Sequence, residues 1–169
     1  MNGSKTGYLM LLGIVLASIV QMSVYWSELP PVIASHFNVR GEPDGWMSKR
    51  GFMLVHAGVI LAMVAAALGM RLLITSLPPW MINLPNRQYW LAPERKSQTA
   101  RIIADHMVWL FVATTLFLLV IFELAYRANL GQPAGIRILP LPLLAVYLGF
   151  MTAWLVAFYR KFGKGDCRG

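Results

Sequence analysis

Two histidines and two carboxylates are the side chains of this sequence that could act together in chemistry at one depth of the protein. They are Glu28, His36, His56 and Glu123. Imidazole nitrogens and carboxylates suit zinc, and imidazole changes charge near neutral pH. We expect His36 and His56 to approach one another and to share a proton or a zinc ion with a carboxylate. The alternative is structural: His56 bonds a main-chain carbonyl, and Glu123 pairs with Arg127 one helical turn later.

No motif in the sequence indicates an enzyme. It contains no nucleophile elbow, phosphate-binding loop, paired catalytic carboxylates or haem attachment sequence. An enzyme is therefore unsupported, although the sequence does not exclude one. The net charge of +8 could suggest nucleic acid, but the basic residues form no tract with interleaved aromatics, so we expect no nucleic-acid partner.

Four apolar runs must position these residues, over 6–27, 52–72, 107–126 and 138–159. A hydrocarbon core about 30 Å thick needs roughly 20 helical residues. The chain is 57% hydrophobic and only 13% charged, and what remains outside the runs is too short for a second core. We predict an all-α membrane protein, a single domain over 1–169 folded as an antiparallel four-transmembrane-helix bundle. Gly58, Ala62 and Ala66 recur every four residues in the second run and predict an internal helix contact.

The basic residues flank the runs unequally. Four spans place both termini on one side, together with ten of the fifteen Lys and Arg residues: Lys5, Arg71, Arg87, Arg95, Lys96, Arg101, Arg160, Lys161, Lys164 and Arg168. The other side holds Arg40, Lys49, Arg50, Arg127 and Arg137. Positively charged short loops stay in the cytoplasm. We therefore predict cytoplasmic termini and an outer loop between the first two spans.

That outer loop has the chemistry of an ordered turn. Its prolines at 30–31 end the first helix, Pro43 fixes φ, and Gly41 and Gly45 permit positive φ. The inner stretch 76–105 contains Pro78, Pro79 and Pro85 and then Pro93, from which a helix can run into the third span. Basic and aromatic residues in this stretch predict contact with lipid or a partner: Asn86, Arg87, Tyr89, Trp90 and Arg95.

The outer loop resembles a known family. Residues 29–49 follow the pattern Leu-Pro-x-x-Ile-x-x-His-Phe-Asn-x-x-Gly-x-Pro-Asp-Gly-Trp-x-x-Lys. This pattern is similar to a domain of unknown function in bacterial membrane proteins related to the SdpI immunity protein. The stretch 83–95 is similar to a segment that follows this domain in many members, so the likeness covers about 7–95. Ala34 stands where proline is common in the family.

The resemblance implies a multi-pass protein of the bacterial inner membrane. SdpI-type proteins confer resistance to a secreted membrane-active toxin and signal its presence. By analogy, a peptide toxin or a membrane protein partner would meet the outer loop. The residues expected to contact it are His36, Phe37, Asn38, Gly41, Asp44 and Trp46.

Three functions remain open from the sequence. The first is a binding or sensing protein with an SdpI-like immunity or signalling role. The second is an accessory subunit of a larger membrane complex, which the small size and short loops suit equally well. The third is a metal-dependent or proton-coupled carrier using His56 and Glu123, which would need a dimer to enclose a path.

The charge asymmetry predicts an orientation that single cysteines can test. With Cys167 replaced by serine, a cysteine at position 40 should react with an impermeant thiol reagent in intact cells. Cysteines at positions 5 and 95 should react only after the cells are permeabilised. Labelling of position 95 but not of position 40 in intact cells would refute this orientation.

Overall fold

The computed structural model describes residues 3–38, 40–131 and 140–163. They are mostly helical, with four helices long and apolar enough to cross a membrane. In chain order the elements are α1 (Gly3–Glu28), β1 (Val32–Phe37), β2 (Pro43–Ser48), α2 (Lys49–Ser76), the 3₁₀-helix η1 (Pro79–Met81), α3 (Arg87–Trp90), α4 (Pro93–Asn129) and α5 (Pro140–Gly163). The all-α prediction is therefore wrong in one respect, because the outer loop forms a two-stranded antiparallel sheet.

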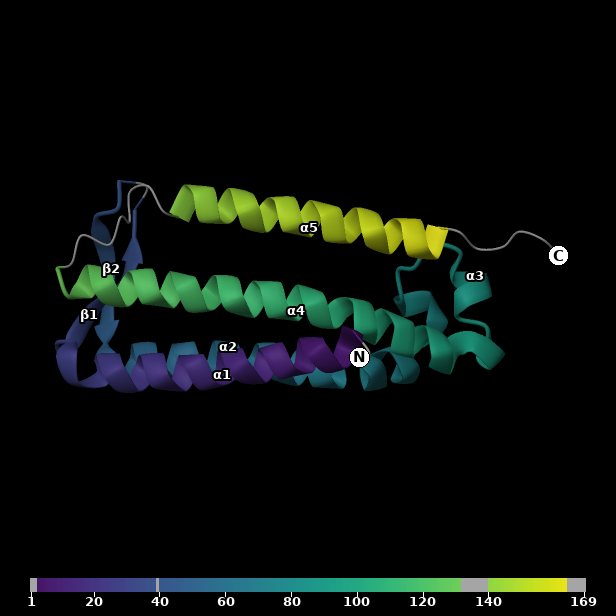
Figure 1. Ribbon diagram of the computed structural model, residues 1–169, viewed down its shortest axis with the longest axis horizontal. Helices are drawn as coiled ribbons and strands as arrows, with labels where there is room; N and C mark the ends of the chain where they lie inside the picture. Colours follow the sequence, from purple (N-terminus) through teal and green to yellow (C-terminus); the bar gives the residue numbers. More distant parts are fainter. Residues whose placement is uncertain (1–2, 39, 132–139, 164–169) are drawn as a thin grey trace.

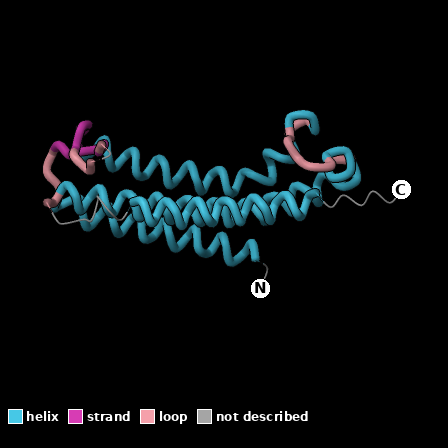
Figure 2. The backbone as a smooth tube through the Cα atoms, turned by 90° about the horizontal axis from the view of Figure 1, so that it is seen from above, coloured by secondary structure: helices cyan, strands magenta, loops and turns pink. Residues whose placement is uncertain are grey.

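The four long helices lie lengthwise beside one another, with the sheet at one end and α3 at the other (Figure 1). α4 contacts α1, α2 and α5, and α1 also contacts α2. Figure 2 shows the same lengthwise arrangement from above, with the strands and α3 at opposite ends. Large apolar side chains cover the outside of the helices; Leu54, for example, is 73% exposed. An apolar exterior of this kind suits a lipid environment.

Buried side chains gather in three places along the helices. The cluster at the hairpin end comprises Leu29, Ile33, Phe52, Met53 and Tyr126. The middle cluster comprises Leu11, Ile14, Ala67, Val108 and Val112. The cluster at the α3 end comprises Ile74, Ile82, Leu84, Leu91, Ala100, Ile103 and Phe162. The hairpin end is therefore packed through α1, α2, α4 and β1 together.

The small residues of α2 do not make the predicted internal contact. Gly58, Ala62 and Ala66 are exposed, and no atom lies within 4 Å of the position that a Cβ on Gly58 would occupy. The buried face of α2 instead carries larger residues, including Phe52, Met53, His56 and Ile60. A repeat of small residues is compatible with close packing, but the larger apolar surface of the neighbouring stripe is the one that this fold buries.

The hairpin turn is built by Asn38 and Gly41. The Asn38 side-chain oxygen accepts hydrogen bonds from the main-chain N–H groups of Arg40 and Glu42, and Gly41 has a φ of 75°. The positive φ predicted for Gly41 is thus confirmed, whereas the prediction of a positive φ for Gly45 is wrong. Gly45 lies in β2 opposite His36, where a Cβ would come 3.0 Å from the Cβ of His36. The absence of a side chain at Gly45 lets β1 and β2 approach closely at a bulge.

Two polar side chains fix the hairpin to the helices. Asn129, at the end of α4, accepts a hydrogen bond from Ala34 N–H at 2.7 Å and donates one to Ala34 C=O at 2.9 Å. Its carboxamide therefore pairs with β1 as a neighbouring strand would. Lys49 Nζ donates to the carbonyls of Trp26 and Leu29, at 2.9 and 3.0 Å. Proline at position 34 would lack the N–H that Asn129 binds, so Ala34 is suited to this contact.

The Asn129 contact predicts a local effect on the hairpin. Asn129→Ala should remove two hydrogen bonds to β1 and cost about 1 to 2 kcal/mol of local stability. Hydrogen exchange at the Ala34 amide should then speed up by roughly tenfold or more, measured by mass spectrometry in detergent. Ser27→Ala is the control, since the Ser27 hydroxyl bonds only its own helix at Val24. Unchanged exchange in Asn129→Ala would contradict the anchoring role.

Candidate functional site

The exposed face of the hairpin carries three of the six predicted ligand-contacting residues. Trp46 is 60% exposed, and the side chains of His36 and Asp44, which bond one another, are 73% and 44% exposed. The other predicted contacts act differently: Phe37 is half-buried, while Asn38 and Gly41 shape the turn. The hairpin thus presents an indole beside a polar pair, a combination suited to amphipathic partners.

The four residues expected to gather at a metal do not do so. Glu28 is exposed, His36 pairs with Asp44, and His56 and Glu123 have separate sets of partners. Within the described ranges no group of three or more His, Cys, Asp or Glu side chains could hold a metal ion. The expected approach of His36 to His56 is therefore wrong, because each imidazole is satisfied by nearer groups of its own.

His56 lies at the centre of a buried polar contact between three helices. Its Nε2 is 3.0 Å from the Ser18 hydroxyl of α1, and its Nδ1 is 2.8 Å from the Tyr126 hydroxyl of α4. The ring stacks on Phe122 with centroids 3.9 Å apart. The alternative of a main-chain partner for His56 is not what the structure shows: its partners are side chains, and His56 and Tyr126 have no exposed surface.

The hydrogen bonds around His56 use both ring nitrogens. The Tyr126 hydroxyl lies between His56 Nδ1 at 2.8 Å and Met53 Sδ at 3.2 Å. A neutral imidazole donates at one nitrogen and accepts at the other, so it can bond Tyr126 and Ser18 at the same time. Ser18 is only 2% exposed, and a serine without access to substrate cannot act as a nucleophile. The contact therefore joins helices and does not serve acyl transfer.

Glu123 is the centre of a second polar cluster one turn from the first. It pairs with Arg127 at 2.6 Å, as the spacing predicts, and also accepts hydrogen bonds from Gln21 and Tyr25, both at 2.7 Å. Tyr25 stacks on Tyr126 with centroids 4.7 Å apart, so the two clusters touch through their rings. No hydrogen bond joins His56 to Glu123, whose partners are separate.

The partners on α1 were detectable in the sequence. Ser18, Gln21 and Tyr25 follow one another at spacings of three and four, so they lie on one helical face inside an otherwise apolar run. Gln21, Tyr25 and Glu123 also border an open hollow of about 460 Å³. The Gln21 Oε1 atom is buried and has no hydrogen-bond partner among the described residues.

The predicted inner contact residues divide into two groups. Asn86 and Trp90 bond the carbonyls at the end of α5: Asn86 Nδ2 donates to Phe162 and Gly163, and Trp90 Nε1 donates to Phe162. Arg87 is exposed, and the exposed Arg95 lies over the ring of Tyr89 at 4.0 Å. Asn86 and Trp90 are therefore occupied inside the chain, while the two arginines are available at the surface.

Comparison with known proteins gives a family for one part of the chain. Residues 13–61 match the Domain of unknown function (DUF1648), which covers most of α1, the hairpin and the start of α2. No curated protein and no solved structure matches the chain. The matched region contains the whole hairpin together with Ser18, Gln21, Tyr25 and His56.

The His56 contact predicts a coupled stability effect. Tyr126→Phe should leave His56 Nδ1 unpaired in a buried place and cost about 1 to 3 kcal/mol, measured by unfolding in detergent. His56→Phe and the double variant complete a mutant cycle, which should give a coupling energy of at least about 0.5 kcal/mol. Tyr147→Phe, which loses a half-buried bond to Thr114, is the control. Additive effects of Tyr126→Phe and His56→Phe would contradict the contact.

Proposed function

We propose that this chain is a binding or sensing protein of the bacterial inner membrane. In this proposal its four long helices form an antiparallel bundle with both termini in the cytoplasm, and the hairpin lies on the outer side. The observation that carries the proposal is the exposed group Trp46, His36 and Asp44 on a hairpin that is bonded to helix ends. A loop with only a connecting role needs neither the anchoring nor an exposed indole.

The proposed ligand is a membrane-active peptide. Such a peptide is amphipathic, and Trp46 offers it an apolar surface while the His36–Asp44 pair offers polar partners. The residues around the hairpin carry charges of both signs. Contact with Trp46 would therefore contribute more to the binding free energy than attraction by the net charge of the hairpin. The SdpI-like immunity or signalling role is the named form of the proposal. It rests on the resemblance of residues 29–49, which lie within the matched domain of unknown function over 13–61.

The anchoring gives a route for signalling. Ligand binding that moved β1 would act on Asn129, which lies in the last turn of α4, two residues beyond Arg127. The Arg127–Glu123 pair in turn contacts Gln21 and Tyr25 of α1. A shift of the hairpin would therefore change contacts between α1 and α4, and α4 runs on to the α3 end of the molecule (Figure 1).

Tolerance of sensitive bacteria to a panel of cationic membrane-active peptides tests the proposal. Expression of the chain should raise the inhibitory concentration of at least one peptide, and Trp46→Ala should abolish the gain. Val32→Ala is the matched control, because Val32 is also 60% exposed but lies on β1. Expression levels are compared by immunoblot. No protection against any member of the panel, or equal loss in both variants, would refute the proposal.

An accessory-subunit function is the second candidate, and α5 is the reason for it. α5 packs mainly against α4 and exposes many large side chains, among them Leu141, Val146 and Tyr159. Such a surface could receive helices of another membrane protein. If the panel gives no protection and the chain co-purifies with a stoichiometric partner in mild detergent, the subunit function replaces the sensing one.

A further inference from the structure

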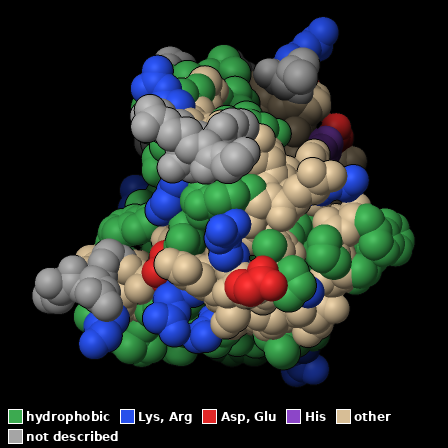
Figure 3. All heavy atoms as spheres, turned by 90° about the vertical axis from the view of Figure 1, so that its right-hand side faces the viewer, with side chains coloured by type: hydrophobic (Ala, Val, Ile, Leu, Met, Phe, Trp, Pro, Cys, Tyr) green, Lys and Arg blue, Asp and Glu red, His purple; other side chains and the backbone are tan. Residues whose placement is uncertain are grey.

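Exposed cations gather at the end of the molecule opposite the hairpin. They come from all the long helices and from α3: Lys5, Arg71, Arg87, Arg95, Arg101, Arg160 and Lys161. None of the seven forms an ion pair with a described residue. Among the described residues, the exposed acids at this end are Glu94 and Asp105. Figure 3 looks onto this end and shows Lys and Arg side chains spread across it, with few acidic ones.

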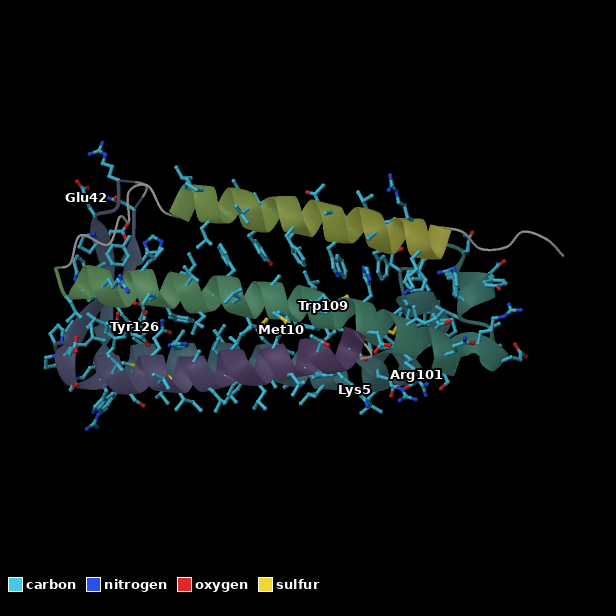
Figure 4. All side chains as sticks on the ribbon, viewed as in Figure 1. Lys5, Met10, Glu42, Arg101, Trp109 and Tyr126 are labelled. Carbon is cyan, nitrogen blue, oxygen red and sulfur yellow. The ribbon has the colours of Figure 1, made fainter. Side chains whose placement is uncertain are left out.

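Some of these cations are brought together by the packing of α1 on α4. A Cβ on Gly7 would lie 2.9 Å from Val108 Cγ1, so the start of α1 lies directly against α4. Figure 4 shows Lys5 of α1 and Arg101 of α4 on the same side of the molecule, toward this end. This side therefore presents cations from two different helices.

The same end exposes apolar side chains where a soluble protein would not. Trp80 and Met81 of η1 are 72% and 53% exposed. Lys96 holds the chain just before them, since its Nζ donates to the carbonyls of Thr75 and Leu77, both at 2.7 Å. An indole exposed beside cations is typical of the boundary between hydrocarbon and headgroups.

The length of α4 sets the depth of these residues. Its 37 residues span about 55 Å at 1.5 Å per residue, whereas the hydrocarbon core is about 30 Å thick. The apolar part of α4 fills the core, so its first turns, with Arg95 and Arg101, extend into the headgroup layer. Cations at that depth meet lipid phosphates.

We propose that this basic end is a binding surface for anionic phospholipid headgroups, with Trp80 and Met81 entering the interface beside them. The proposal does not depend on the function of the hairpin. Its occupant follows from charge complementarity, because seven unpaired cations face two acids, and from the apolar side chains, which a soluble anion would leave in water.

Lipid retention by the full chain tests the proposal. The protein is purified in detergent with equal amounts of phosphatidylglycerol and phosphatidylcholine, and native mass spectrometry counts each bound lipid. The wild type should retain phosphatidylglycerol in clear preference. Each cation near an anionic surface contributes roughly fivefold, so Lys5→Gln with Arg101→Gln should lower the preference by roughly twenty-fivefold.

The control removes the same charge from the other end. Arg40→Gln with Arg50→Gln, two exposed cations near the hairpin, should leave the preference unchanged. Wild-type protein in 0.5 M salt should lose the preference for phosphatidylglycerol, because salt screens surface charges. This measurement does not depend on whether a variant folds. Equal retention of the two lipids by the wild type, or equal loss in both double variants, would overturn the proposal. Loss of the preference with inorganic phosphate at the lipid's concentration would show a soluble-anion site and overturn it as well.

Discussion

A helix leaves its last four carbonyls without partners, and in a membrane protein these ends are costly unless the chain itself satisfies them. Here side chains from other elements supply the missing donors. Lys49 bonds carbonyls at the end of α1, Lys96 bonds those of α2, and Asn86 with Trp90 bonds those of α5. Each donor lies in or next to a connecting segment. Lys49 and Lys96 tie their segments to a helix that the segment joins, whereas Asn86 and Trp90 tie the segment between α2 and α4 to the end of α5.

This constraint explains why both ends of the molecule can present residues in fixed positions. The hairpin continues directly into α2, where the Ser48 hydroxyl accepts the Gly51 N–H, and Asn129 pairs with the edge of β1. At the other end, η1 follows the carbonyls that Lys96 binds. The exposed indole of Trp46 lies on a strand that pairs with β1, and that of Trp80 follows the carbonyls that Lys96 binds. Backbone fixed in this way lowers the entropy cost of binding a partner.

The sequence predicts what depends on local spacing. Apolar runs locate the four long helices, Pro93 marks the start of α4, and a spacing of four pairs Glu123 with Arg127. Both hairpin strands have only six residues, and β2 contains Pro, Asp and Gly, which are depleted in strands, so the sequence pattern does not signal a sheet. The hydrogen bond of Asn129 to Ala34 joins residues 95 positions apart, and neither residue type predicts this contact. Long-range contacts of this kind require the packed structure.

Polar contacts join the helices at several levels of the bundle. Under the hairpin, α1, α2 and α4 meet at His56, and α1 and α4 meet again at Glu123 one turn away. Farther along, α4 bonds α5 through Thr114 with Tyr147 and through His106 with Trp154. Apolar surfaces can slide against one another in a bilayer with little change in energy, whereas each buried hydrogen bond fixes one register. The hydrogen bonds of His56 and Glu123 therefore help to set the positions of α1, α2 and α4 at the hairpin end. A ligand that strained this end would have to move α1 and α4 together or break the hydrogen bonds between them.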